Sequence, residues 1–336
     1  MTASEPHAAA KPPEPRRGLR RRFTDNATAL LVIGGLKLML HMPDRPVWAL
    51  ADLAGSVSYH LSGDRRNRAR RNLRRILEWM AANGRGDASY RAAATDPKAL
   101  EALVREAFRH HAHYNVELAR APRFTEKWVQ DRLDVENPAE VDAWLMKGRA
   151  LILIGMHFGA IEVPGIYALH HLGRIVSPME TIANARVQRY VFSTRDTIGI
   201  RIVTLADAGQ LLAALRNNEA VGLVADRNLS GGGIEVELFG AATKIPAGPV
   251  LLAAETGAPV YMSAVRRIGH GRYRGRVRPL PTPEGASRRE RSRAMARDEA
   301  ALFEEFIIDA PEQWLAVFHP IWPDLEQPMP EDGDRV

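Results

Sequence analysis

A histidine and a glutamate lie five residues apart in the segment Leu151-Ile-Leu-Ile-Gly-Met-His157-Phe-Gly-Ala-Ile-Glu162. The apolar part predicts a buried strand, and the rest predicts the loop and first helical turn that follow it. His157 is therefore expected at the carboxyl end of a sheet strand, where open α/β sheets bind ligands. An imidazole in that position, near a carboxylate, can act as a general base on an alcohol.

The spacing of His157 and Glu162 is weak evidence by itself. Of the 11 histidines, His319 is also followed by an acid five residues later, Asp324, and two prolines there disfavour a strand-to-helix turn. The alternative interpretation is a solvent-facing pair without a function, because a fold does not by itself imply one. Only the strand–loop–helix setting distinguishes His157.

A second group of charged residues follows another predicted strand, in Gly222-Leu-Val-Ala-Asp226-Arg227. The glycine-rich loop after it, Gly231-Gly-Gly, has bare backbone amides that could approach an anion, although a flexible turn is the alternative. No Gly-Lys-Ser/Thr follows, which excludes a P-loop.

Several other classes of site are excluded or disfavoured. The 336 residues include no cysteine, which rules out disulfides, thiolate metal sites and cysteine nucleophiles. No Gly-x-Ser-x-Gly elbow is present, so a serine hydrolase is not expected. His110, His113 and Glu117 have a helical spacing that could face a metal. Without a His-Glu-x-x-His pattern or flanking ligands, a histidine-rich helix face is favoured.

The net charge of +6 is concentrated near the amino terminus, where residues 1–75 hold fifteen basic and six acidic side chains. This asymmetry predicts an anionic surface, lipid or nucleic acid, as a partner. No nucleic-acid motif accompanies the arginines of residues 65–75, which favours a solvated basic helix face over a nucleic-acid site.

The longest nearly apolar run, residues 27–40, is shorter than the roughly 20 residues of a spanning helix. Arg20, Arg21 and Arg22 precede it, as in a signal peptide, but no small-residue cleavage site follows. We therefore expect an uncleaved helix that lies in a membrane interface with its arginines at the headgroups. A buried core helix with a solvated basic flank is the alternative.

Hydrophobic periodicity divides the chain into a helical part and a sheet part. Residues 1–18 are expected to be a disordered tail and 329–336 a second tail, while helices near 25–41, 46–62, 64–80 and 97–120 form a membrane-associating region, 19–120. Within 121–328, strands near 150–154, 174–176, 200–204, 220–225, 234–238 and 260–266 alternate with helices near 160–172, 184–198, 206–217 and 246–257, before a last helix at 287–309. The alternation predicts an α/β fold whose central, mostly parallel sheet is flanked by helices and is continuous with the helical region.

Several segments together resemble the bacterial acyltransferases that make lipid A and phosphatidylinositol mannosides. Over residues 25–325, the resemblance rests on four ordered blocks: His157-x4-Glu162; Glu180 through Arg195, with Asn184 and Tyr190; Asp226-Arg227, Glu235, Phe239-Gly240 and Pro246-Ala-Gly248-Pro249; and Glu312-Gln-Trp314 before His319 and Trp322. The third block looks closer to the mannoside enzymes of actinobacteria, because lipid A enzymes more often show a Pro-Asp-Gln-Asp type run there. Thr181 departs from the arginine expected in the mannoside enzymes, and this departure bears on the acceptor.

The resemblance implies a glycerolipid acyltransferase-like fold and an O-acyltransferase that moves a fatty acyl group from acyl-CoA or acyl carrier protein to a glycolipid hydroxyl, foremost on a phosphatidylinositol mannoside. It implies His157 as the base, Glu235 as a candidate for orienting it and Glu162 in support, with the substrate bound by Glu180, Asn184, Arg195, Asp226 and Arg227. Arg227 or a backbone amide of the glycine loop would hold the oxyanion.

The resemblance also implies partners and a location. Acyl-CoA is a co-substrate, and neither a cofactor nor a metal is expected. The partners are the acyl donor, anionic membrane lipid and the glycolipid acceptor, without nucleic acid, at the cytoplasmic face of the bacterial plasma membrane as a peripheral or monotopic protein. The alternatives are a lipid A-type or other acyltransferase of the same fold, an enzyme with an amine acceptor, and a non-enzymatic membrane or nucleic-acid-binding protein.

Overall fold

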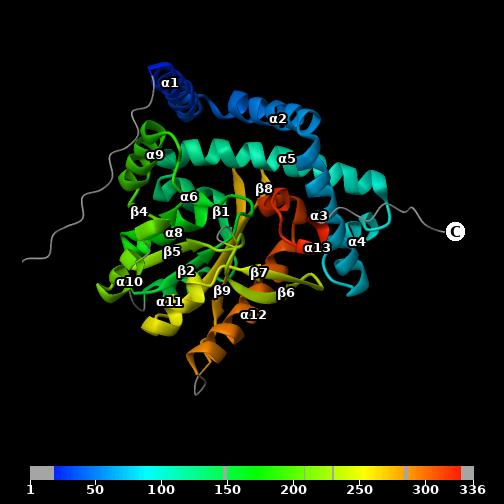
Figure 1. Ribbon diagram of the computed structural model, residues 1–336, viewed down its shortest axis with the longest axis vertical. Coiled ribbons are helices and arrows are strands. Elements are labelled where there is room, and N and C mark those ends of the chain that lie inside the picture. The colour runs from blue at the N-terminus through cyan, green and yellow to red at the C-terminus, as the bar shows by residue number, and fades with distance from the viewer. Residues whose placement is uncertain (1–18, 147–149, 208, 229–230, 284–286, 327–336) are drawn as a thin grey trace, which may run out of the picture.

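The computed structural model describes residues 19–146, 150–207, 209–228, 231–283 and 287–326. Both predicted tails, 1–18 and 329–336, lie outside these residues. The side chains of Arg20, Arg21 and Arg22 are not described either. A seven-stranded sheet occupies the centre, with helices on both faces (Figure 1). The predicted α/β class, with a mostly parallel sheet flanked by helices, is confirmed.

The central sheet has the strand order β1-β9-β8-β2-β5-β3-β4. All neighbouring strands in it pair in parallel except β8 and β9, which are antiparallel. Its strands are β1 (Leu133–Val135), β2 (Ile152–Gly155), β3 (Ile175–Met179), β4 (Ile200–Thr204), β5 (Ala220–Val224), β8 (Val260–Gly269) and β9 (Arg272–Leu280). Because β2 lies between β5 and β8, the residues that follow β2 and β5 lie next to each other at the carboxyl edge.

A separate two-stranded ribbon is formed by β6 (Ile234–Leu238) and β7 (Ala241–Ile245). Its two-residue turn is Phe239-Gly240, and both residues have positive φ, 50° and 72°. Such turns match the right-handed twist of a hairpin. The strand predicted at 234–238 therefore exists, but it pairs outside the central sheet.

The two faces of the sheet are packed by different helices because side chains alternate along each strand. Ile152 and Ile154 of β2 belong to a large core cluster with residues of α10, α11 and α12, whereas Leu151 packs on the other face with α7 and α8. These helices are α7 (Pro138–Met146), α8 (Glu162–Leu172), α10 (Gly209–Arg216), α11 (Gly248–Thr256) and α12 (Arg288–Ile307).

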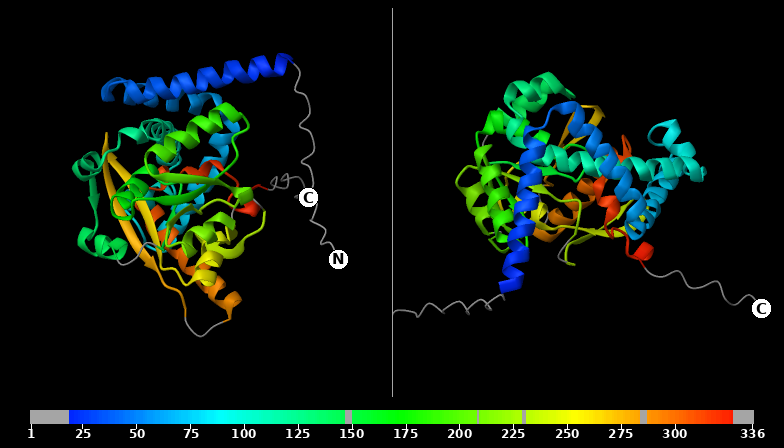
Figure 2. Two further views of the ribbon diagram at one scale, coloured as in Figure 1. Left: turned by 90° about the vertical axis from the view of Figure 1, so that its left-hand side faces the viewer. Right: turned by 90° about the horizontal axis from the view of Figure 1, so that it is seen from above.

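The amino-terminal helices lie over one end of this sheet. The long α5 packs against α2 and α1, which lie on its outer side (Figures 1 and 2). Leu73 of α3 and Val104 of α5 join the same core cluster as Ile152. The remaining helices are α1 (Leu19–His41), α2 (Asp44–Leu61), α3 (Gly63–Ala82), α4 (Ala88–Ala93), α5 (Pro97–Arg120), α6 (Glu126–Arg132), α9 (Ala185–Thr197) and α13 (Pro323–Glu326). Within the described ranges, none of the helices combines the length and apolarity needed to cross a bilayer.

Several arginines of α3 have partners inside the molecule, which differs from the solvated basic face expected from the sequence. Arg70 pairs with Glu101 of α5 at 2.7 Å. Arg68 pairs with Glu326 at 2.9 Å, and Arg75 pairs with Asp324. These ion pairs connect α3 to α5 and to the carboxyl-terminal segment.

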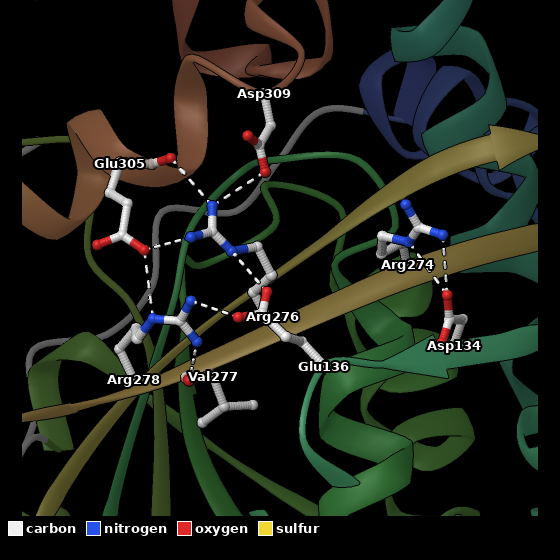
Figure 3. Close-up of polar contacts among 8 residues, drawn as sticks. All are labelled: Asp134, Glu136, Arg274, Arg276, Val277, Arg278, Glu305 and Asp309. Carbon is white, nitrogen blue, oxygen red and sulfur yellow. Dashed lines mark hydrogen bonds and ion pairs between the residues drawn. The ribbon is translucent and has the colours of Figure 1, made fainter. Parts of the chain in front are cut away.

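Arginines at alternate positions of β9 are also paired (Figure 3). Arg276 and Arg278 both contact Glu305 of α12 and Glu136, which directly follows β1. The alternation places these side chains on one face of the strand. The acids therefore attach β9 both to α12 and to the edge of the sheet.

Candidate active site

His157 lies just beyond the carboxyl end of β2, on the loop that leads into α8. Its backbone N–H donates to Asp226 Oδ2 at 3.0 Å, and its carbonyl accepts from the N–H of Leu315 at 2.6 Å. Gly159 has φ +52°, and a Cβ there would lie 2.1 Å from the carbonyl oxygen of Val265. The loop thus requires glycine at 159 to lie against β8 and hold His157 in place.

Two contacts determine which ring nitrogen of His157 carries the proton. Nδ1 lies 2.7 Å from Asp226 Oδ1, and Nε2 lies 2.7 Å from Arg227 Nη2. An ionised carboxylate only accepts hydrogen bonds and a guanidinium only donates them, so Nδ1 carries the proton and Nε2 the lone pair. The ring therefore presents a basic nitrogen on the side away from Asp226.

Asp226 is completely buried, with a side chain 0% exposed, and it accepts three hydrogen bonds. Two come from His157 and the third from Trp314 Nε1, at 2.8 Å from Oδ2. Burial raises the pKa of the Asp226 carboxyl, but its interaction with His157 and these hydrogen bonds outweigh burial and hold the pKa below its usual value. Asp226 is thus an anion that can orient the ring and stabilise an imidazolium.

Arg227 contacts both histidines at the mouth of the site. Its Nη2 contacts His157, and its Nη1 lies 2.9 Å from His319 Nε2. Burial, followed by the nearby Arg227 charge, lowers the pKa of His319 to about 4, so His319 is neutral at pH 7 and accepts this hydrogen bond. Glu180, an exposed acid, lies 3.4 Å from Nη2.

A cavity of about 380 Å³ opens beside His157 and extends over the face of the sheet that α7 and α8 cover. Its walls are largely apolar, with Trp144 of α7 and Tyr261 of β8 among them, and the charged residues Arg227 and Glu180 lie in its lining near His157. Small residues on the sheet leave the space open, namely Gly155, Ser177, Gly222, Ser263 and Gly275. At Gly222, an added Cβ would already lie 3.0 Å from the side chain of Ile175. The site therefore joins a base to a largely apolar cavity.

Residues 15–323 match the family model of the bacterial lipid A biosynthesis acyltransferases. The chain belongs to this family. The phosphatidylinositol mannoside acyltransferase of Mycobacterium tuberculosis is 26% identical over 254 residues, 74% of each chain. That of Mycolicibacterium smegmatis is 28% identical over 164 residues, which is 47% of this chain and only 54% of that protein. The resemblance predicted from the sequence is confirmed.

The structure of this acyltransferase family member brings most of the predicted site residues together. Five of them line the cavity: His157, Glu162, Glu180, Arg195 and Arg227. Asp226 lies behind the His157 ring. Asn184 is at the amino-terminal cap of α9, where its side chain accepts from the N–H of Arg186 at 3.0 Å.

Two carboxylates were expected to assist His157, namely Glu235 by orienting its ring and Glu162 in support, and both lie elsewhere. Both oxygens of Glu162 pair with Arg195 of α9, one of them at 2.6 Å, in a buried contact. Glu235 is exposed on β6, opposite Lys244 in the ribbon, and is not among the residues lining the cavity. The prediction that Glu235 orients His157 is corrected here: Asp226 contacts Nδ1, because β5 neighbours β2 whereas β6 leaves the sheet.

Roles for Trp314 and His319 were not predicted, although both lie in the closing block that the family resemblance includes. Trp314 reaches Asp226, and an isolated bridge pairs its backbone with Phe158. The sequence signal for both residues was the tryptophan block itself. Their contact partners, Asp226 and Arg227, lie 88 and 92 residues earlier in the chain.

A buried ion pair supports the His157 loop from behind. Arg267 Nη2 donates to the carbonyl of Gly159 at 2.7 Å, and Arg267 Nε donates to Glu117 at 2.8 Å. The hydroxyl of Tyr273 also donates to Glu117, at 3.0 Å. The helix that carries the predicted histidine-rich face thus contributes Glu117 to the support of the active-site loop.

Proposed function

We propose that this protein is a membrane-associated O-acyltransferase that moves a fatty acyl group from an acyl thioester to a glycolipid hydroxyl, foremost on a phosphatidylinositol mannoside. The observation that carries the proposal is a histidine whose Nε2 holds the lone pair of the ring, oriented by a buried aspartate, at the mouth of an apolar cavity. The names of the mycobacterial relatives support the choice of acceptor. We propose acyl-CoA or an acyl carrier protein as the donor.

In the proposed reaction, the acceptor hydroxyl displaces Arg227 from His157 Nε2. Nε2 takes the hydroxyl proton while the oxygen attacks the thioester carbonyl carbon, and Asp226 stabilises the imidazolium. Arg227 donates to the oxyanion of the tetrahedral intermediate. When that intermediate collapses, the carbon–sulfur bond breaks and the imidazolium protonates the departing thiolate. The products are an ester and a free thiol, and no covalent enzyme intermediate forms.

The test is thioester consumption from palmitoyl-CoA with a panel of acceptors: a phosphatidylinositol mannoside, a lipid A precursor, a monoacylglycerol and an acyl-accepting amine. We expect ester formation with the mannoside in preference to the others. Preferred turnover of the lipid A precursor would replace the mannoside with the lipid A-type alternative. Binding to anionic vesicles without turnover of any acceptor would instead support the non-enzymatic membrane protein.

The cavity supports a fatty acyl donor because its lining is largely apolar. Ser263 of β8 lies in this lining and is only partly buried. Each methylene that moves from water into such a cavity contributes about 0.8 kcal/mol. Side chains that fill the cavity should therefore select against long acyl chains.

Ser263→Leu is expected to lower kcat/KM for palmitoyl-CoA by about tenfold relative to octanoyl-CoA, since displacing two methylenes forfeits about 1.6 kcal/mol. The measurement is initial rates with both donors. Ser263→Ala is the matched control, because it removes the hydroxyl without filling space, and its preference should match the wild type. An unchanged chain-length preference in Ser263→Leu would show that the acyl chain lies elsewhere.

Apolar side chains on α1 and α2 support the proposed membrane association. Among the side chains that the structure describes, eight large exposed hydrophobic ones are on these two helices: Leu30, Leu31, Val32, Leu38, Leu50, Leu53, Val57 and Leu61. Both helices lie on the outer side of α5 (Figure 2). Exposed apolar surface of this extent is typical of membrane or protein interaction sites.

The double substitution Leu50→Glu and Leu53→Glu is expected to weaken binding to vesicles of phosphatidylglycerol and phosphatidylethanolamine by at least about tenfold, because each leucine placed in the bilayer contributes of order 1.5–3 kcal/mol. Cosedimentation measures the partitioning. Leu251→Glu controls for the addition of one such charge at an exposed leucine elsewhere, since Leu251 belongs to α11. Equal losses in both variants would contradict a specific membrane-binding face.

A further inference from the structure

The outward face of α2 carries an apolar stripe. Its members recur at intervals of three and four residues and are between 47% and 80% exposed: Leu50, Leu53, Val57 and Leu61. That spacing places them on one side of the helix. The other side packs closely on α5, where an added Cβ at Gly55 would lie 2.7 Å from the Cα of Arg109. The stripe is therefore exposed along the helix, and it ends at Leu61, two residues before the start of α3.

Two arginines lie at this end of α2, and both contact Tyr59. The guanidinium carbons of Arg66 of α3 and Arg105 of α5 are each 5.2 Å from the centre of its ring. Arg66 Nη1 also donates to the carbonyl of Tyr59 at 3.1 Å. The exposed His60 packs edge-on against the same ring, with the ring centres 5.0 Å apart. Because Tyr59 is two residues before Leu61, both guanidinium groups lie where the apolar stripe ends.

Neither arginine has an acidic partner in the described part of the chain, unlike several other arginines of α3. The carboxylate that reaches this place is Glu101 of α5, which accepts from the hydroxyl of Tyr59 and pairs with Arg70 at 2.7 Å. The group of Arg66, Arg70 and Arg105 thus contains three guanidinium ions and one carboxylate. Two positive charges remain available to an anion from outside the protein.

The contacts with Tyr59 also hold both guanidinium groups in place. A cation over the face of an aromatic ring is attracted by the ring quadrupole, and arginine stacks on such rings more readily than lysine. Long side chains that are already ordered lose less conformational entropy when they bind a ligand. The end of the stripe therefore combines fixed cations with an adjoining apolar surface.

We propose that Arg66 and Arg105 bind the phosphate groups of anionic phospholipids while the apolar stripe of α2 lies in the membrane interface. Helices in an interface bury an apolar face at the acyl boundary and place cations at the headgroups. Guanidinium groups bind phosphate oxygens through charge-assisted hydrogen bonds. This assignment rests on the proposed membrane association. It adds the residues that make membrane binding depend on anionic lipid.

The test measures partitioning of the full chain by cosedimentation onto two kinds of vesicle, phosphatidylglycerol mixed with phosphatidylcholine and phosphatidylcholine alone. One double variant combines Arg66→Gln with Arg105→Gln, and a second combines Arg66→Lys with Arg105→Lys. The matched control combines Arg289→Gln with Arg293→Gln, two exposed arginines on α12, which lies far from α2 (Figure 1). At about 0.15 M salt, charges are screened beyond about 8 Å, so this control reports the same charge change away from the site.

The glutamine pair at 66 and 105 is expected to partition about twenty- to thirtyfold more weakly onto the phosphatidylglycerol vesicles, because each arginine at an anionic surface contributes about a factor of five. The lysine pair should lose less, and the control pair should match the wild type within about twofold. Binding to phosphatidylcholine alone should be equal in all four proteins. Equal losses in the glutamine pair and the control pair overturn the site.

Two other outcomes also overturn it. A loss of the same size on phosphatidylcholine alone would assign the effect to the fold of α2, and a loss in the lysine pair equal to that in the glutamine pair would assign it to packing on Tyr59. Thioester turnover is measured in parallel with acceptor dispersed in detergent. If turnover is absent while the glutamine pair selectively loses binding to phosphatidylglycerol, the proposed acyl transfer fails and the lipid site stands. If turnover is normal and that pair binds both vesicles like the wild type, only the lipid site fails.

Discussion

His157→Ala is expected to lower kcat for acyl transfer by at least about a thousandfold, because it removes the base that activates the acceptor and the acid that protonates the leaving thiolate. The ring is the group whose Nε2 lone pair faces the mouth of the cavity. Asp226 cannot replace it, since its carboxylate is fully buried behind the ring. Thioester consumption and ester formation, measured with the preferred acceptor, give the size of the loss.

The same variant should keep its fold and its membrane binding. The loop around residue 157 is held by backbone contacts with Asp226 and Leu315, which alanine retains. His170→Ala serves as the matched control, because His170 is a partly exposed histidine on α8 that contacts Glu126 and not the cavity. We expect its turnover to equal that of the wild type. Turnover of His157→Ala within threefold of the wild type, with a normal thermal transition, would refute the assignment of the base.

The parts of the fold that could be predicted are those whose signal is local. The apolar runs of β2, β5 and β8 predict buried strands because each run is continuous and short. Strand β9 was missed because it contains no apolar run: arginines take alternate positions, and its large apolar residues are only Tyr273, Val277 and Leu280. Acids such as Glu305 pair with Arg276 and Arg278, and that pairing depends on tertiary structure.

The candidate site shows the same limit. His157 could be identified from its strand–loop–helix setting, which lies within twelve residues of sequence. Its partner could not, because the choice between Asp226, Glu162 and Glu235 depends on which strand neighbours β2. The sheet order places the end of β5 beside His157, whereas the predicted pairing of β6 with the sheet does not occur. Trp314 and His319 reach the site from the carboxyl-terminal segment for similarly non-local reasons.

Asp226→Asn is the second substitution with a large expected effect, and its cause is the tautomer of His157. Two donors face Oδ2 of Asp226, namely the backbone N–H of His157 and Trp314 Nε1. An asparagine in the same space will place its carbonyl oxygen there and turn its NH2 group toward His157 Nδ1. Since the NH2 group only donates, Nδ1 must then accept, and the ring proton moves to Nε2.

The result of that shift is a ring whose Nε2 has no lone pair for the acceptor proton and whose positive form has lost its anionic neighbour. We therefore expect kcat to fall by about 10³–10⁴, a loss of the size seen when the orienting aspartate of a catalytic histidine is made an amide, with KM for the acyl donor little changed. Steady-state kinetics separates the two constants. Glu162→Gln is an informative comparison, because its carboxylate pairs with Arg195 and not with the ring. Glu162→Gln should leave the tautomer of His157 unchanged. A loss of kcat in Glu162→Gln that equals or exceeds the loss in Asp226→Asn would contradict the assignment of Asp226 as the residue that orients His157.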